Sequence, residues 1–181
     1  MEAAYHDIHR DIVELSKAGN RKAQYQLYKL YSRAMFNICC RMLNSFEEAE
    51  DILQESFAEA FNKLGSFRFE STFGAWLKRI VVNRCINHLK KRKAELVYTQ
   101  TLPENIMEDE APDYEQIQLE VKKVHKAMEL LPDGYRVIFS LYLIEGYDHA
   151  EIAEIMGITE STSKSQFSRA KVKIKEILNT L

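Results

Sequence analysis

The sequence predicts an all-α protein made of two small helical domains joined by an acidic linker. Apolar residues recur three and four positions apart along most of the chain, which is the spacing of one helix face. Only 6 glycines and 3 prolines occur in 181 residues, too few for the many tight turns of an all-β protein. Residues 95–116 break the apolar pattern with Pro103, Pro112 and an acidic run, which predicts a linker of about 20 residues.

Composition narrows the class of protein further. Apolar residues make up 46% and charged residues 29% of the chain, so it can bury a core. The longest apolar run, residues 137–144, is far shorter than the ~20 residues that span a bilayer. The first residues lack the basic start and apolar stretch of a secretory signal, and the three cysteines form no C-x-x-C pair. We expect a cytoplasmic protein that inserts into no membrane and needs no metal or cofactor.

Charge is segregated along the chain although the formal net charge is only −2. Residues 44–59 contain six Asp or Glu and no Lys or Arg, whereas residues 60–93 contain nine Lys or Arg and one Glu. Residues 94–120 again contain only acidic charges, with eight Asp or Glu and no Lys or Arg. Alternating blocks of this kind indicate separate surfaces for separate partners, although any one block could simply be a solvated face.

Three helices are predicted at the start of the first domain, residues 1–94. The first spans residues 7–18 and stops at Gly19 and Asn20. The third begins at Ser45, which has capping-box spacing to Glu48, and ends at Gly65. The second helix is expected to bury one side, formed by Ala23, Leu27, Leu30, Ala34 and Ile38. The apolar stripe of the third consists of Ala49, Ile52, Leu53, Phe57, Ala60, Phe61 and Leu64.

The opposite face of the third helix is acidic. It carries Glu47, Glu48, Asp51, Gln54, Glu55 and Glu59. Carboxylates in the first turn favour the helix dipole, but this effect fades beyond that turn. The continuing acid indicates a docking surface for a basic partner as readily as a solvated face.

A basic helix follows, capped by Thr72 and running to Lys93. Trp76, Asn83, Asn87 and Lys90 fall within about 40° of one line on it. Cations neutralise phosphates, amides can contact base edges and exposed rings stack on bases, so this face suits a nucleic-acid strand. The preceding loop carries Phe67, Phe69 and Phe73 and could shape a pocket for an unstacked base. Phe73, with either Phe67 or Phe69, is expected in the core instead.

The second domain, residues 117–181, has the pattern of a helix-turn-helix. Two helices lead to Pro132 and Gly146, and a short helix from His149 to Met156 opens with Asp148 and Glu151 at capping-box spacing. Gly157 forms the turn, and the last helix starts near Glu160. Its first turns present side chains able to contact bases or phosphates: Ser161, Thr162, Lys164, Ser165, Gln166 and Arg169.

These motifs, in this order and over nearly the whole chain, resemble the extracytoplasmic-function (ECF) sigma factors of bacteria. The segment from Glu48 to Phe57 is similar to the family's core-polymerase-binding motif. The segment from Phe73 to Asn83 is similar to its promoter-melting segment, and Asn83 to Lys93 to its −10-contacting helix. The segment from His149 to Ala170 is similar to its −35-contacting helix-turn-helix.

The resemblance implies a subunit of RNA polymerase that directs initiation, not an enzyme. It implies core-polymerase contacts by Glu48, Asp51, Ile52, Gln54 and Glu55. It implies contacts to a melted −10 element by Phe69, Trp76, Arg79, Asn83, Arg84, Asn87, Lys90 and Lys91. The last helix, within a helix-turn-helix from His149 to Ser168, would contact the −35 element through the six side chains named above. The linker would thread toward the catalytic cleft of the polymerase. An anti-sigma factor, frequently a membrane protein, would mask both domains.

Two positions depart from the family pattern. Ser163 stands where a branched apolar residue usually packs between the two helices of the helix-turn-helix, so a weaker local core or a shifted recognition helix is expected. Asn87 stands where an acidic residue is common in the family, so the family's −10 sequence preference applies less directly to this chain.

Two other functions are open at this point. A transcriptional regulator whose helix-turn-helix acts alone would bind duplex DNA tightly without the polymerase. A nuclease or hydrolase could use the carboxylates between Glu47 and Glu55 with a divalent metal. Acidic residues along one helix flank do not converge easily on one ion, which disfavours the second alternative.

Overall fold

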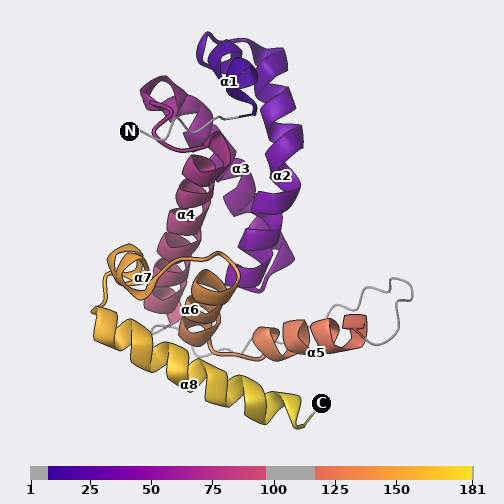
Figure 1. The fold of residues 1–181 in the computed structure, drawn as a ribbon, viewed down its shortest axis with the longest axis vertical. Coiled ribbons are helices and arrows are strands. Elements are labelled where there is room, and N and C mark those ends of the chain that lie inside the picture. The colour runs from indigo at the N-terminus through magenta and orange to yellow at the C-terminus, as the bar shows by residue number, and fades with distance from the viewer. Residues whose placement is uncertain (1–7, 97–116, 181) are drawn as a thin grey trace. The chain divides into compact units, whose positions relative to one another are not determined.

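The computed structural model describes residues 8–96 and 117–180, and these residues are helical as predicted (Figure 1). The elements in chain order are α1 Arg10–Lys17, α2 Arg21–Leu43, α3 Phe46–Lys63, the 3₁₀ turn η1 Leu64–Ser66, α4 Phe73–Leu96, α5 Ile117–Glu129, α6 Asp133–Leu143, α7 His149–Met156 and α8 Glu160–Leu178. The predicted linker, residues 95–116, lies outside the described residues except for the last two residues of α4.

The chain divides into two compact units, residues 1–88 and 89–181, and this division falls inside α4. The first domain was predicted to end at residue 94. Cys85 and Ile86 of α4, just before this boundary, are buried, at 0% and 4% exposure. Beyond them α4 continues as one helix with exposed Asn87, Lys90 and Lys91.

Side-chain caps and left-handed residues set the corners of the first unit. Asn20 accepts hydrogen bonds from the backbone of Lys22 and Ala23 at the start of α2, at 3.0 and 3.2 Å. Asn44 ends α2 with a φ of +54°, and the Ser45 hydroxyl accepts from the Glu48 backbone at 3.3 Å. This tight corner folds α3 back along α2 (Figure 1). Thr72 caps α4 as predicted, accepting from the Ala75 backbone at 3.2 Å.

Two local predictions for this unit are wrong. Leu30 is 48% exposed and Ala34 is exposed, whereas Met35, Cys39 and Met42 are buried. The buried stripe drifts around α2 because this 23-residue helix packs against both α1 and α3, and no straight line along it faces both. Gly65 does not end α3 in a left-handed conformation, because α3 passes directly into η1.

The second unit is built around α8, which packs against α5, α6 and α7. Its core consists of Ala127, Met128, Leu131, Val137, Ile138, Phe139, Leu141, Ile152, Ala153, Phe167, Ala170 and Ile174. Both hydrogen bonds of the predicted capping box between Asp148 and Glu151 are present, and Gly157 ends α7 with a φ of +69°. The turn between α7 and α8 is therefore the predicted helix-turn-helix turn.

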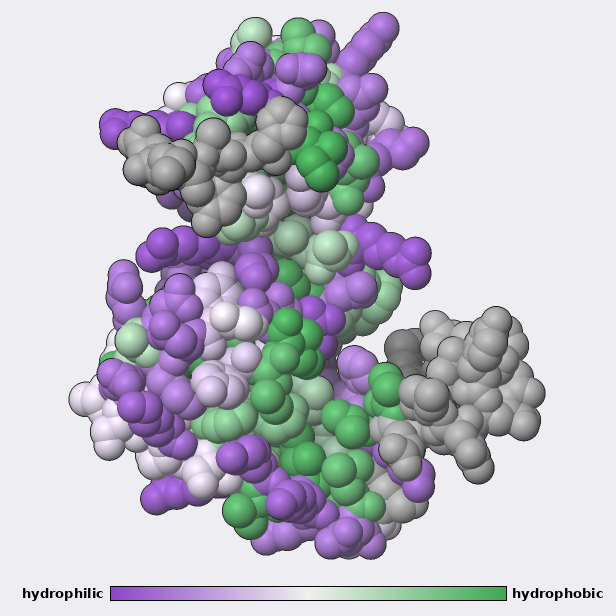
Figure 2. Space-filling model, in the orientation of Figure 1, coloured by the Kyte–Doolittle hydropathy of each residue, from purple (hydrophilic) through white to green (hydrophobic). Residues whose placement is uncertain are grey.

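Apolar side chains also reach the surface of this unit, as the green areas of Figure 2 show. Leu130, Leu143 and Val172 are 59%, 54% and 57% exposed. Within the described ranges, none of the helices combines the length and the apolar character needed to cross a membrane.

Candidate functional site

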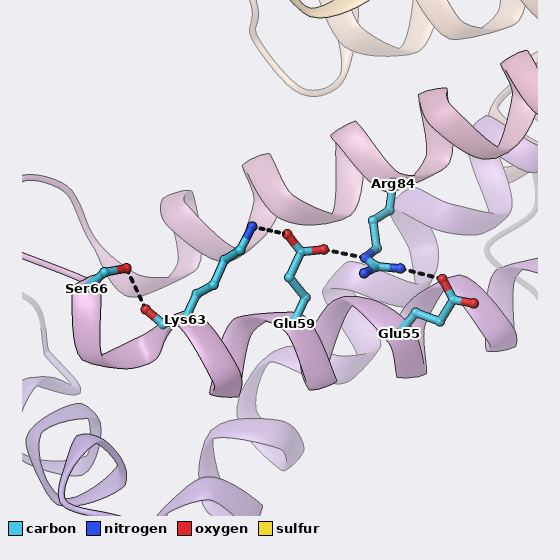
Figure 3. Close-up of polar contacts among 5 residues, drawn as sticks. All are labelled: Glu55, Glu59, Lys63, Ser66 and Arg84. Carbon is cyan, nitrogen blue, oxygen red and sulfur yellow. Dashed lines mark hydrogen bonds and ion pairs between the residues drawn. The ribbon is translucent and has the colours of Figure 1, made fainter.

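The acidic side of α3 is divided between two environments. Glu48, Glu55 and Glu59 lie seven and four residues apart and face α4. Glu48 Oε1 lies 3.3 Å from His88 Nε2, Glu55 pairs with Arg84 Nη1, and Glu59 Oε2 lies 2.5 Å from Arg84 Nε (Figure 3). These contacts connect α3 to α4, so part of the acid is structural.

Lys63 completes this network from the same helix as Glu59. Its Nζ lies 2.6 Å from Glu59 Oε1 (Figure 3). The Lys63 hydrogen bond and the Arg84 guanidinium hold the pKa of Glu59 below its ordinary value of 4.5, against the opposing effect of partial burial. Glu59 is therefore charged at neutral pH when α4 packs against α3.

The remaining part of the acidic side faces solvent. Glu47, Asp51 and Gln54 are exposed, whereas Ile52 is only 4% exposed and belongs to the core between the helices. The α3 backbone thus holds two carboxylates and an amide on a face that has room for a partner. Ile52 supports this face from below and does not form part of it.

A groove of about 270 Å³ between α2 and α3 borders the same face. Gln54 lies on it, and aromatic side chains of Tyr28, Phe36 and Phe46 line it. Phe46 is 62% exposed and makes an edge contact with Phe36, with ring centroids 5.1 Å apart. Sequence analysis missed this groove, although Phe46 lies one turn before Ala49 and extends the apolar stripe of α3 to the Ser45 cap.

Along α4, most of the predicted DNA-contacting side chains are accessible. Arg79, Asn83, Asn87, Lys90 and Lys91 are exposed. Trp76 and Arg84 are half-buried, and the Arg84 guanidinium binds the α3 carboxylates of Glu55 and Glu59. Its position on α4 thus serves the α3–α4 contact in this structure.

The loop before α4 forms an aromatic cluster with the first turn of that helix. Phe73 and Phe67 are buried, at 0% and 4% exposure, which confirms the expectation that Phe73 and one neighbour belong to the core. Phe69 and Trp76 are half-buried, and both contact Phe67, with ring centroids 4.8 and 5.1 Å away. Phe69 adopts a φ of +59°, rare for a bulky residue and typical of positions held for function.

Two cations of α1 lie on this cluster, and sequence analysis missed both. The Arg10 guanidinium carbon lies 4.7 Å from the Phe69 ring centroid, and Lys17 Nζ lies 5.3 Å from it. Lys17 also donates to the Phe67 carbonyl at 2.7 Å. These contacts join residues about 50 positions apart in sequence, and no local pattern signals them. Together the rings and cations present a surface suited to bases and phosphates.

On α8, the predicted side chains divide by exposure. Ser161, Lys164, Ser165 and Arg169 are exposed, whereas Thr162 and Gln166 are half-buried. Lys164 pairs with Glu160 at 2.6 Å on the helix surface. Ser163 is fully buried, and α8 is nevertheless one continuous helix from Glu160 to Leu178.

Across the described ranges, no group of three or more His, Cys, Asp or Glu side chains is arranged to hold a metal ion. Two of the α3 carboxylates proposed for a metal-dependent hydrolase, Glu48 and Glu55, are directed at His88 and Arg84. Their geometry fits a helix contact.

Two helical units, one ending in a basic helix and one containing a helix-turn-helix, define a two-part DNA-binding protein. Two family models match separate parts of the chain: Sigma-70 region 2 matches residues 27–95, and Sigma-70, region 4 matches residues 122–174. These ranges include α3 and most of α4 in the first case and the helix-turn-helix in the second.

Whole-chain relatives narrow the class to one family. The ECF RNA polymerase sigma factor SigW of Bacillus subtilis is 31% identical over 179 residues, which cover 91% of this chain and 94% of SigW. The ECF RNA polymerase sigma factor SigM of Mycobacterium tuberculosis is 30% identical over 164 residues, which cover 91% and 81%. The chain therefore belongs to the ECF sigma factors of RNA polymerase, as the sequence motifs predicted.

Solved structures share the fold. The sigma factor RpoE of Bartonella quintana, crystallised with the anti-sigma factor NepR, superposes with a TM-score of 0.64 at 25% identity, over 86% of this chain and 96% of RpoE. CnrH, solved in complex with the cytosolic domain of CnrY, superposes with a TM-score of 0.58 at 22% identity, over 95% and 97%.

Proposed function

We propose that this chain binds core RNA polymerase and directs it to promoters that carry a −10 and a −35 element. The observation that supports this most strongly is the separation of three surfaces on one ECF sigma factor chain. One is the exposed acidic side of α3, the second is the aromatic and basic surface of α4, and the third is the start of α8. The chain would act in the cytoplasm as an initiation factor and would catalyse no reaction itself.

Docking on the polymerase would use Asp51, Gln54 and the adjoining groove. A basic helical partner would place cations on the carboxylate side of α3 and an apolar side chain in the groove beside Phe46. Glu55, first expected to contact the polymerase directly, would also keep α4 in place behind this surface, because it pairs with Arg84. Glu48, with the same expected role, lies 3.3 Å from His88 Nε2 on the α4 side.

Recognition of the −10 element would use the exposed face of α4 and the aromatic cluster. Asn83 and Asn87 offer amides for base edges, and Arg79, Lys90 and Lys91 offer cations for phosphates. Trp76 and Phe69 would stack against unpaired bases of a melted strand, with Arg10 and Lys17 close enough to bind the adjoining phosphates.

Recognition of the −35 element would use the major groove and the N-terminal turns of α8. Ser161, Ser165 and Arg169 are exposed there, and a helix-turn-helix contacts bases with this part of its second helix. Residues 95–116 would join the two promoter-binding units as an acidic linker. Residues 94–120, which include this linker, carry eight carboxylates, and this negative charge would favour a path along basic surfaces of the polymerase.

An anti-sigma factor is the proposed regulatory partner. The Bartonella quintana relative of known structure was crystallised with such a factor. The exposed apolar side chains on both units, including Phe46 and Leu143, are available for contacts of this kind.

A binding experiment separates this function from that of a stand-alone regulator. We expect the isolated chain to bind duplex promoter DNA weakly and to bind it stably, with strand opening, once purified core polymerase is added. Fluorescence anisotropy of labelled promoter and permanganate footprinting of unpaired thymines measure both properties. Tight duplex binding without the core enzyme, unchanged by its addition, would instead support the stand-alone regulator.

A further inference from the structure

A partly buried polar contact joins the two helices of the helix-turn-helix. Ser163, in the first turns of α8, is 0% exposed, and its Oγ lies 2.9 Å from Nδ1 of His149, the first residue of α7. This is the position at which the family usually has a branched apolar residue, and Ser163 was expected to weaken the local core or shift the helix. A hydrogen bond therefore takes the place of an apolar contact here, and the family resemblance did not foresee it.

The His149 ring is itself held by aromatic neighbours. It stacks on Tyr142 of α6, with ring centroids 4.4 Å apart and planes 16° apart, and it makes an edge contact with Phe167 of α8 at 5.6 Å. Tyr142 also contacts Phe167 at 4.5 Å. The backbone of His149 directly follows Asp148, whose capping box fixes the start of α7. The ring contacts and the capped start of α7 together restrict the position of the imidazole that contacts Ser163.

Because the imidazole is held in place, its hydrogen bond to Ser163 restricts the position of α8 relative to α7. Apolar contacts are non-directional and tolerate small slides of one helix past another. A hydrogen bond weakens steeply when its length or angle changes, and a buried hydroxyl that loses its partner is destabilising. The contact can form with either tautomer of the imidazole, because a hydroxyl both donates and accepts. Any rotation or shift of α8 at Ser163 would break it.

The DNA-facing side chains of α8 lie directly beside this contact. Thr162 and Lys164 flank Ser163 in sequence, and Gln166 lies one turn further along the helix. A rotation of α8 that broke the contact would move all three relative to α7. The position of the Ser163 hydroxyl and the position of the DNA-contacting side chains are therefore linked.

We propose that Ser163 and His149 form a positioning pair that sets the orientation of α8 and thereby the −35 sequence preference of the holoenzyme. The pair acts through neighbouring residues and touches no base itself. This inference rests on the proposed recognition of the −35 element by α8.

The test uses the full chain, purified core polymerase and two promoter libraries. One library is randomised at the −35 hexamer with the −10 element fixed, and the other is randomised at the −10 element with the −35 hexamer fixed. Ser163→Ala removes the hydroxyl, and His149→Phe removes Nδ1 while keeping a ring to stack on Tyr142. Because each single substitution leaves the other polar group without this hydrogen bond, the double variant Ser163→Ala with His149→Phe removes both polar groups together. Thr180→Ala, which removes an exposed hydroxyl just after the end of α8, is the matched control. Transcripts are counted for each hexamer.

We expect each single variant to change the relative use of −35 hexamers by about fivefold or more, and to leave −10 preference and core affinity unchanged. The double variant should change −35 use by less than the product of the two single effects, because both remove the same contact. Thr180→Ala should keep the wild-type ranking. A merely structural role would lower total transcription without reordering the hexamers, so an unchanged −35 ranking in variants that bind core polymerase would overturn the proposal. If the wild-type holoenzyme itself shows no −35 preference, the proposed role of α8 fails, and the positioning pair fails with it.

Discussion

Gly157 is the residue on which the turn between α7 and α8 depends most. Its φ of +69° lies in the left-handed region, where any side chain with a Cβ is strained. Gly65 was assigned a similar role in ending α3, but it does not adopt a positive φ, and a Cβ added there would meet no atom within 4 Å. The two glycines therefore form a matched pair for a stability test.

We expect Gly157→Ala to destabilise the helix-turn-helix by about 1–2 kcal/mol. Hydrogen exchange of the amides of α7 and α8 measures this locally. Gly65→Ala should change the exchange of α3 by less than about 0.5 kcal/mol, because no strain is introduced. Equal effects of the two substitutions would show that backbone conformation at Gly157 does not limit stability.

Glu59 gives the first unit a defined dependence on pH. Its pKa is lowered in the folded state by Lys63 and Arg84, so its charge contributes stability that is present above its ordinary pKa of 4.5. That contribution is lost as the pH falls through the lower folded-state pKa.

We expect Glu59→Gln to flatten the loss of stability of the first unit between neutral pH and about pH 3. Trp76 is the only tryptophan of the chain and lies in α4, so its fluorescence follows unfolding of this unit. Lys63→Met, which removes the largest cause of the shift, should reproduce part of the effect. A Glu59→Gln profile as steep as that of the wild type would contradict the assignment.

At the scale of single elements, the polar residues of α3 form two stripes, one that contacts α4 and one that faces solvent. Glu55 and Glu59 bind Arg84 of α4, and Asp51 and Gln54 are exposed to solvent. This division determines which substitutions can test docking cleanly. Glu55→Lys would place a cation beside Arg84 and disturb the α3–α4 contact, whereas changes at Asp51 and Gln54 leave that contact intact.

We expect Asp51→Lys combined with Gln54→Lys to lower affinity for core polymerase by about tenfold or more, because a basic partner would meet added positive charge. The melting temperature should stay at the wild-type value. Gln26→Lys, an exposed position on α2, adds one of these charges elsewhere and should leave core affinity unchanged. Wild-type affinity of the double variant would remove α3 from the docking surface.

The α8 helix is predicted to separate DNA recognition from polymerase binding. We expect Arg169→Ala to weaken the dependence of transcription on the −35 element by about 1–3 kcal/mol without changing core affinity. Lys175→Ala, near the C-terminal end of the same helix, serves as the control. Parallel loss of core affinity and −35 dependence in Arg169→Ala would argue against the separation of the two surfaces.

At the scale of the whole molecule, sequence periodicity and capping signals were sufficient for the two-unit helical fold. Thr72, Asp148 and Gly157 act as predicted, because each signal is local and needs no distant partner. The buried face of α2 was placed wrongly because two different neighbours cover it, and periodicity describes only one straight stripe.

The parts of the site that escaped prediction all depend on contacts between distant segments. Lys17 meets the loop at Phe67, Arg84 meets Glu55, and His149 meets Ser163 across the helix-turn-helix. A sequence shows which side chains are charged or polar, but not which of them the fold turns toward each other. Only tertiary structure could therefore show that Glu55 and Arg84, assigned to two different partners, engage one another.

The proposed function requires that this chain alone makes core polymerase selective for promoters. Mapping RNA 5′ ends after transcription of fragmented genomic DNA, with core enzyme in the presence and absence of the purified chain, tests it most directly. We predict that the chain creates a new set of start sites, each preceded by the same two short sequence elements at a fixed spacing. Identical start sites with and without the chain would contradict the account.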